Sequence, residues 1–365
     1  DLFNVTSPDP GLVLKMSGPT DVLKLQFDAG VEEDVWSDIR KSFAIPDLES
    51  RHVRVREKAL LKNTRMVNAL LERSEPYIYF IAQECAKRGM PAELALLPFV
   101  ESEFNPHARS PAAAVGLWQF IPSTGRQYSL RQNKWVDERR DLVASTRAAL
   151  DYLGYLYNMH GDWHLALISY NWGEGSVLKA MKKAQDAGLE PTWANLDLPQ
   201  ETRQYIPKLQ ALKNLILNPQ RFGLTLPEFP NKPYFEEIKR NSDVDLREVA
   251  RLAGVDLGVI RELNPGLNQP VLYAAYSNSL LVRADTPSRL AALRQLVIAL
   301  DRPGAGGDIR VVYLRNADAE KLAETLRAIH GADAGANMGS PTGAMLGAAV
   351  PAEVETASGR TSGII

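Results

Sequence analysis

Residues 94–104 read Leu-Ala-Leu-Leu-Pro-Phe-Val-Glu-Ser-Glu-Phe, and this stretch holds two acidic side chains in different settings. Leu94, Leu97 and Glu101 are spaced i, i+3 and i+7, so they share one face of a helix. Glu103 lies about 200° further round a helix of 3.6 residues per turn and points elsewhere. The stretch therefore predicts a helix that carries one carboxylate at the end of a buried apolar stripe.

The setting of Glu101 is typical of a general acid. A carboxylate at the rim of an apolar pocket has a raised pKa, because burial disfavours its charged form. A raised pKa is what a carboxyl group needs in order to donate a proton near neutral pH. On periodicity alone the alternative is an exposed or salt-bridged glutamate at a helix end, and Asn105-Pro106 is expected to end that helix.

Length and composition limit the class of protein. The chain has 365 residues, which suggests two or three domains, and its net charge of -2 argues against a nucleic-acid partner. Its single cysteine, Cys85, rules out an internal disulfide framework and a zinc site built on cysteines. No segment approaches the ~20 apolar residues that span a bilayer. The chain begins at Asp1, which leaves open whether a targeting peptide preceded it.

Helical patterning dominates the first two thirds of the chain. Amphipathic repeats run through residues 47–88 and continue from 91 to about 222, with charges in the gaps between apolar positions. Residues 1–45 carry turn signals and little periodicity, so we expect an N-terminal extension there. A single, mainly α domain is predicted over residues 46–226.

The C-terminal third has a different texture. After a proline-rich linker, residues 234–270 hold a compact unit with two short helices, 246–253 and 257–263, around a turn at Gly254. Residues 271–330 read as α+β: strands at 279–283 and 309–314, and helices at 287–300 and 319–329. A Gly/Ala-rich flexible tail is expected over 331–365. The predicted fold class is thus an α+β multidomain chain, a mainly α domain followed by small α+β modules.

Three further motifs attract attention, although each has a purely structural alternative as a packed loop or helix start. They are Gly116-Leu-Trp-Gln119, Ser169-Tyr-Asn171 and Glu201-Thr-Arg-Gln-Tyr205. Nothing around the glycines gives the context of a nucleotide-binding loop. His160 and His164 have the spacing of a helical zinc pair, but Gly161 argues against a regular helix and no third ligand is evident. We therefore expect neither a metal nor a cofactor.

Read together and in this order, Glu101-Ser102 and the three motifs closely resemble the family 1 lytic transglycosylases, and among them the membrane-bound D-type enzymes. The resemblance covers about residues 50 to 224 and includes Asn105-Pro-His-Ala and Pro122-Ser-Thr-Gly-Arg126. It implies a lysozyme-like domain (the SLT domain) that cleaves the β-1,4 bond from N-acetylmuramic acid to N-acetylglucosamine in peptidoglycan. The products carry 1,6-anhydro-N-acetylmuramic acid ends, and no cofactor is needed.

The resemblance also implies the role of each motif. Glu101 is the single acid/base. Ser102 and Gln119 bind substrate beside it, and Tyr170 and Asn171 contact the sugars around the scissile bond. Glu201 and Tyr205 help to shape the wall of the cleft around that bond. The chain departs from the family pattern at three positions, with Ser169 in place of a usual Ala, Trp118 in place of a frequent Met and Ala113 in place of a frequent Gly.

Two further resemblances lie in the C-terminal third. Residues 245–265 resemble a degenerate LysM-type unit, a module that grips N-acetylglucosamine-containing glycans, although its Gly-Asp-Thr-Leu opening is absent and no closing strand is evident. Residues 271–365 resemble the periplasmic N-domains of type II secretion secretins. The expected partners are peptidoglycan strands and a secretion-system or outer-membrane component, with no nucleic acid. The expected location is the periplasm or the outer membrane of a bacterial envelope.

Two other functions remain open on the sequence. A goose-type lysozyme would use a similar glutamate but end in hydrolysis. A catalytically inactive scaffold that binds the cell wall and anchors secretion machinery would explain the secretin-like segment. The LysM-like unit, in turn, has the alternative of a helical spacer without a ligand.

Overall fold

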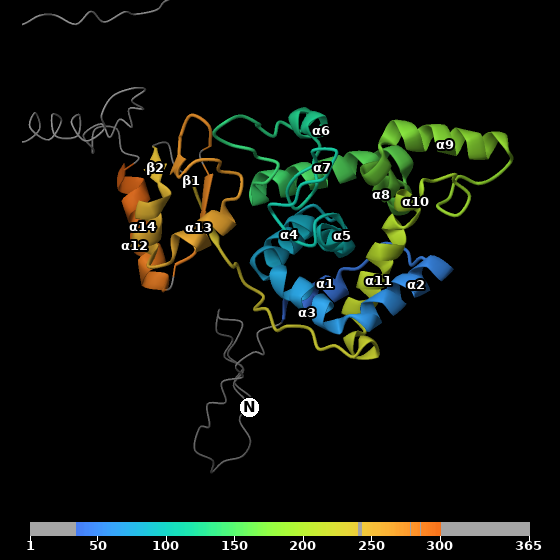
Figure 1. Ribbon diagram of the computed structural model, residues 1–365, viewed down its shortest axis with the longest axis horizontal. Helices are drawn as coiled ribbons and strands as arrows, with labels where there is room; N and C mark the ends of the chain where they lie inside the picture. The colour runs from blue at the N-terminus through green and yellow to red at the C-terminus, as the bar shows by residue number, and fades with distance from the viewer. Residues whose placement is uncertain (1–33, 240–242, 278, 285, 301–365) are drawn as a thin grey trace, which may run out of the picture. The chain divides into compact units, whose positions relative to one another are not determined.

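The computed structural model describes residues 34–300 except 240–242, 278 and 285. Its first part is mainly helical (Figure 1). The elements of this part are α1 (Val35–Lys41), α2 (Arg51–Lys62), α3 (Thr64–Arg73), α4 (Glu75–Lys87), η1 (Ala92–Leu96), α5 (Leu97–Glu101), α6 (Pro122–Gln127), α7 (Leu142–His160), α8 (Trp163–Trp172), α9 (Glu174–Asp186), α10 (Gln200–Arg203), α11 (Tyr205–Leu217) and η2 (Pro219–Phe222).

Local signals account for the break between the two central helices. The carboxylate of Asp141 accepts a hydrogen bond from the Ala144 amide at 2.7 Å and caps α7. Gly161 ends that helix with φ +66, and the Asp162 carboxylate then caps α8 through the Leu165 amide. The predicted break at Gly161 is confirmed, and α7 and α8 pack against each other around it.

The helical core extends beyond the predicted boundary at residue 46. Val35, Trp36 and Ile39 of α1 are buried, and the indole nitrogen of Trp36 donates to the Pro227 carbonyl at 2.9 Å. Phe229 packs against Trp36 with ring centroids 5.7 Å apart. The predicted helical domain over 46–226 is therefore too short at both ends, and the predicted extension over 1–45 is too long. Short apolar helices lack a long periodic pattern, and only packing shows that they belong to the core.

A smaller module with its own core follows the helical part (Figure 1). Its elements are β1 (Glu236–Lys239), β2 (Val244–Asp245), α12 (Leu246–Ala253), α13 (Leu257–Leu263), β3 (Val271–Leu272), β4 (Ser279–Val282) and α14 (Pro287–Leu300). Both helices predicted around Gly254 are confirmed, as are the strand and the helix predicted after residue 278. Gly254 itself has φ +71.

Strand pairing joins segments that the sequence analysis assigned to different domains. β1 pairs antiparallel with β4, so that Glu236 lies opposite Val282. β2 pairs in the same sense with β3. Ile238, Leu280 and Leu293 share one core. The predicted boundary between 234–270 and 271–330 thus divides a packed unit, because the partner of β1 lies more than thirty positions along the chain and local periodicity does not reveal it.

Several expectations lie outside the described residues: the strand at 309–314, the helix at 319–329, the tail over 331–365 and most of the N-terminal extension. Among the helices that the structure describes, none combines the length and apolar character that a bilayer crossing requires.

Candidate functional site

Glu101 is the last residue of a short helix that begins as a 3-10 helix and continues as an α-helix. Leu94 and Leu97 are fully buried, as the apolar stripe predicts. The stretch consists of η1 followed by five residues of α5, and it ends at Glu101 rather than at Asn105-Pro106. The amides of Ser102 and Phe104 both bond to the Pro98 carbonyl, which turns the chain away from the helix axis. Glu101 is therefore the last helical residue and faces a cavity.

The residues after Glu101 leave the helix by an uncommon backbone path. Glu103 and Phe104 have φ of 53° and 54°. Phe104 is buried, with its ring centroid 4.4 Å from that of Phe99. Glu103 is exposed beside Arg73, 3.8 Å away. The two carboxylates therefore differ in setting as predicted, but for another reason: Glu103 lies beyond the end of the helix and not on a different face of it.

A cavity of about 500 Å³ gathers most of the predicted site residues. Six of the seven line it: Glu101, Gln119, Tyr170, Asn171, Glu201 and Tyr205. They come from α5, from the loop before α6, from the end of α8 and from the α10–α11 corner. The side-chain amide of Asn171 has no hydrogen-bond partner among the described residues and is free to meet a ligand.

The Glu101 carboxyl has an altered acidity. Its burial raises its pKa from 4.5 to about 7, and nearby Glu201 acts in the same direction. A hydrogen bond from the Tyr205 hydroxyl and the charge of Lys208 oppose this rise. The net result is a carboxyl group that is both protonated and ionised in comparable amounts near neutral pH, so it is able to donate a proton and to take one back.

Gln119 and Tyr170 anchor a loop as well as lining the cavity. We call residues 108–120 the cavity loop. The Tyr170 hydroxyl donates to the Trp118 carbonyl at 2.8 Å, and the side-chain amide of Gln119 donates to the Gly116 carbonyl at 2.9 Å. Ala113, Gly116 and Gln119 all have positive φ in this loop. Left-handed backbone at Ala113 is a conformation that glycine adopts more easily.

Ser102 is the one predicted site residue that lies away from the cavity. It is buried, and its hydroxyl donates to the Leu117 carbonyl at 2.9 Å. The contact joins the end of α5 to the cavity loop. Direct substrate binding by Ser102 stays a prediction. In the structure its side chain connects the residue after Glu101 to the cavity loop.

Sequence reasoning missed several polar residues of the cavity wall, among them Tyr152, Glu174 and Lys208. Glu174 begins α9, and one of its carboxylate oxygens accepts a hydrogen bond from Tyr152 at 2.8 Å. Glu174 directly follows the Ser169–Gly173 segment, so closeness to that motif was the available signal. Tyr152 and Lys208 belong to long helices, where nothing in the local pattern distinguishes them.

The two spaced histidines have separate partners. His160 Nε2 lies 2.8 Å from the Ser169 hydroxyl, and His164 Nε2 lies 3.0 Å from the Pro46 carbonyl. Over the described ranges, no group of three or more His, Cys, Asp or Glu side chains is arranged to hold a metal ion.

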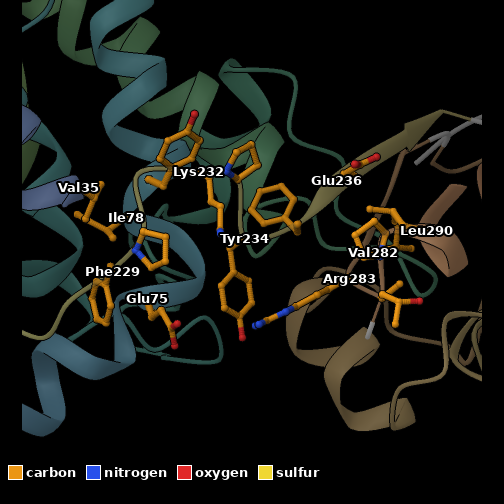
Figure 2. Close-up of a pocket in the computed structure, with 17 residues that line it drawn as sticks. Val35, Glu75, Ile78, Phe229, Lys232, Tyr234, Glu236, Val282, Arg283 and Leu290 are labelled. Carbon is orange, nitrogen blue, oxygen red and sulfur yellow. The ribbon is translucent and has the colours of Figure 1, made fainter. Parts of the chain in front are cut away.

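A second hollow, of about 480 Å³, contains none of the predicted site residues. Figure 2 shows it between α4 and the β4–α14 corner, with Ile78 and Phe229 on its wall and with the Tyr234 and Arg283 side chains directed toward each other. The Arg283 guanidinium lies 3.9 Å from the centre of the Tyr234 ring. The cavity at Glu101 is therefore the candidate active site.

Comparisons with known proteins give matches that include the helical part of the chain. Residues 78–191 match the model of the transglycosylase SLT domain. The chain is 40% identical over 295 residues to membrane-bound lytic murein transglycosylase D of Escherichia coli (strain K12), covering 78% of this chain and 65% of that protein. It is 36% identical over 162 residues to a protein of Alteromonas sp. (strain M-1) named for resistance to tributyltin chloride, covering 44% of this chain and 76% of that protein.

Among solved structures, an inactive mutant of lytic transglycosylase Slt from Pseudomonas aeruginosa is 20% identical, with a TM-score of 0.31 over 42% of this chain and 25% of that one. The chain spans about two thirds of the length of the E. coli relative. The SLT match contains Glu101, Gln119, Tyr170 and Asn171, and it lies within the mainly helical part. Residues 78–191, which include Glu101, are therefore similar to the transglycosylase SLT domain.

Proposed function

We propose that this chain is a peptidoglycan lytic transglycosylase, a carbon–oxygen lyase that acts on the bond from N-acetylmuramic acid to N-acetylglucosamine. One observation carries the proposal: the Glu101 carboxyl group faces a polar cavity, and burial raises its pKa to about 7. The SLT match and the murein transglycosylase relatives support the choice of substrate.

In the first step, neutral Glu101 donates its proton to the glycosidic oxygen while the bond from C1 to that oxygen breaks. N-acetylglucosamine leaves with a free 4-hydroxyl, and Glu101 becomes a carboxylate. The Tyr205 hydroxyl, already bonded to Oε1, stabilises the charge that appears there.

In the second step, the carboxylate takes the proton of the muramoyl C6 hydroxyl as that oxygen attacks C1. The 1,6-anhydro ring closes and Glu101 is neutral again, so protons balance over the cycle. The nucleophile belongs to the substrate, unlike the paired carboxylates of most glycosidases. Glu201 is exposed and Glu174 is bonded to Tyr152. We therefore assign both carboxylates to the wall of the site and neither to the role of nucleophile.

The remaining cavity residues bind the glycan in this proposal. Asn171 and Gln119 supply amides for the sugar hydroxyl and acetamido groups, and Tyr170 supplies a flat apolar face. Glu201 and Tyr205 shape the wall beside Glu101, and Ser102 acts through the cavity loop. A shallower hollow shares Trp172 with the cavity and runs along α9, which suits a polymer better than a small molecule.

The test is a digest of purified peptidoglycan analysed by mass spectrometry, with the unmodified chain beside Glu101→Gln. Glu103→Gln is the matched control, because Glu103 is exposed two positions away. We expect products lighter by one water than reducing muropeptides from the unmodified chain and the control, and none from Glu101→Gln. Reducing ends would indicate a goose-type lysozyme. Absence of products from a folded chain that binds the wall would favour the scaffold.

We also propose that the module over residues 236–282 is a LysM-like glycan-binding unit. Support comes from its order of two strands, two helices and two strands, in which β4, the strand predicted at 279–283, pairs with β1 and closes the unit. Binding of soluble N-acetylglucosamine oligomers to the Glu101→Gln chain, with and without substitutions on α12 and α13, tests the assignment. If the module is only a helical spacer, the substitutions will leave oligomer binding unchanged.

The secretin-like resemblance leads to a separate proposal about partners and location. We propose that the secretin-like segment, residues 271–365, contacts a secretion-system or outer-membrane component, and that the protein acts in the periplasm or at the outer membrane. The membrane-bound relative supports an envelope location. Co-purification of a secretin with the full chain, lost on removal of residues 301–365, tests the partner. Cell fractionation tests the location.

A further inference from the structure

We propose that Arg139 is a positioning residue for the cavity loop, and that residues 266–268 of the C-terminal module hold Arg139 in place through the backbone of 135–137. The inference rests on the proposed function, because it concerns the geometry around the same catalytic carboxyl. It assigns the module a role in catalysis that is separate from glycan binding.

Arg139 holds the cavity loop at two points. One guanidinium nitrogen donates to the Ala113 carbonyl at 3.0 Å and to the Phe120 carbonyl at 3.2 Å. These carbonyls lie at either side of the loop segment that contains Gly116 and Gln119. Arg139 is only 8% exposed, so the contacts are shielded from water and are stronger for it.

The loop approaches the backbone of Arg139 closely as well. Gly116 has φ +81, and a Cβ at that position would overlap the Arg139 carbonyl oxygen. The Gly116 amide bonds back to the Ala108 carbonyl at 3.0 Å. The loop is therefore held against Arg139 by its backbone and by the guanidinium together.

Asp137 fixes the orientation of the guanidinium. Its carboxylate accepts two hydrogen bonds from the Arg139 guanidinium, at 2.9 and 2.8 Å, and the pair is buried. A bidentate pair of this kind sets direction as well as distance. Arg140 lies 3.9 Å from the same carboxylate and is the other cation facing it.

The C-terminal module reaches this pair through backbone atoms. The Asp137 amide donates to the Gly266 carbonyl at 2.8 Å, and the Asn268 amide donates to the Trp135 carbonyl at 2.9 Å. Val136 forms a bridge with Leu267 between them. Two segments more than a hundred residues apart thus pair as a short antiparallel ladder, with Asp137 at its end.

Gly266 is the point at which this ladder is most sensitive. A Cβ there would lie 3.1 Å from both the Asp137 carbonyl oxygen and the Asp141 amide nitrogen. A larger side chain must push residues 137–141 away from the module. Such a shift moves the guanidinium of Arg139 and, with it, the cavity loop that carries Gln119.

The experiment compares the unmodified chain with Gly266→Val, in the full chain, on a soluble peptidoglycan fragment. We expect kcat to fall about 10- to 100-fold with little change in KM, since a misplaced catalytic loop affects the reacting geometry more than distant sugar contacts. Hydrogen exchange at the Val115 and Gly116 amides should rise in the same variant. Gln295→Ala, an exposed change on α14 of the same module, is the matched control.

Arg139→Lys provides a second variant. It keeps the charge but loses the fork that serves both Asp137 and the loop, so kcat and amide protection should fall together. Unchanged exchange in Gly266→Val would overturn the proposal, and so would faster exchange with unchanged kcat. If the unmodified chain is inactive, the proposed function fails, while the exchange data still decide whether the module holds the loop.

Discussion

The Tyr205 hydroxyl, at the first residue of α11, donates a hydrogen bond to Oε1 of Glu101, at the last residue of α5, across 104 positions of sequence. The bond favours the ionised form of the carboxyl, whereas burial favours the neutral form and is the larger effect. The opposing effects leave the pKa of Glu101 at about 7, where a group is able to act as acid and then as base.

Replacing Tyr205 with Phe should remove the opposing effect and slow the reaction. The carboxylate formed after proton donation would lose a charge-assisted hydrogen bond, so we expect kcat to fall about 10-fold or more. The pKa of Glu101 should rise, which moves the alkaline decline of activity to higher pH. Tyr155→Phe, at an exposed tyrosine, serves as the control. A lower kcat with an unmoved pH profile would contradict the assignment.

The pH dependence of kcat/KM should report Glu101 in the free protein. The first step needs the neutral carboxyl, so activity should be level in mild acid and fall about tenfold per pH unit above a pKa of about 7. Initial rates on a soluble glycan fragment between pH 5 and 9 provide the measurement. A decline that begins near the ordinary value for glutamate would mean that burial does not control the group.

The same pKa predicts a stability difference for Glu101→Gln. The folded pKa is raised from 4.5 to about 7, so folding favours the neutral carboxyl and the chain loses stability as pH rises through that window. The amide does not ionise. The variant should therefore be more stable than the unmodified chain at pH 8, by about 1–3 kcal/mol, with the difference disappearing near pH 4. Urea unfolding at the two pH values measures it, and a constant difference would argue against the linkage.

Gly116→Ala tests the close approach of the cavity loop to Arg139. The substitution adds backbone strain at φ +81 and a clash with a carbonyl oxygen, so we expect a loss of about 2–4 kcal/mol. Gly161→Ala is the matched control: it has φ +66 with no neighbouring atom within 4 Å, so it should cost only about 1 kcal/mol. Thermal unfolding compares the two, and equal losses would show that the clash is relieved.

Trp36→Ala tests whether the helical domain begins before residue 46. Trp36 is completely buried and bonded to the Pro227 carbonyl, so the substitution should reduce stability by about 3–5 kcal/mol. His52→Ala on the next helix is a milder aromatic control, because His52 is only half-buried. A loss below 1 kcal/mol on chemical unfolding would place α1 outside the cooperative unit.

Much of the fold follows from local pattern. The two helices around Gly254, the strand at 279–282 and the helix from 287 were all predictable, because periodicity and turn residues act over a few positions. The domain boundaries were predicted less well. Trp36 has no local signal of membership in the core, and the pairing of β1 with β4 joins residues that only the folded chain brings together.

By itself the sequence identified the ordered motifs, and with them Glu101 as a carboxyl at the end of an apolar helix face, because helix geometry follows from spacing. Only the tertiary structure decided how acidic that carboxyl is and what surrounds it. Tyr205 and Glu174 line the cavity from two separate helices, and the burial of Glu101 depends on how these helices pack. Arg139 contacts the cavity loop from a segment that the second module holds. Desolvation and long-range hydrogen bonds depend on three-dimensional distance, which the order of residues does not specify.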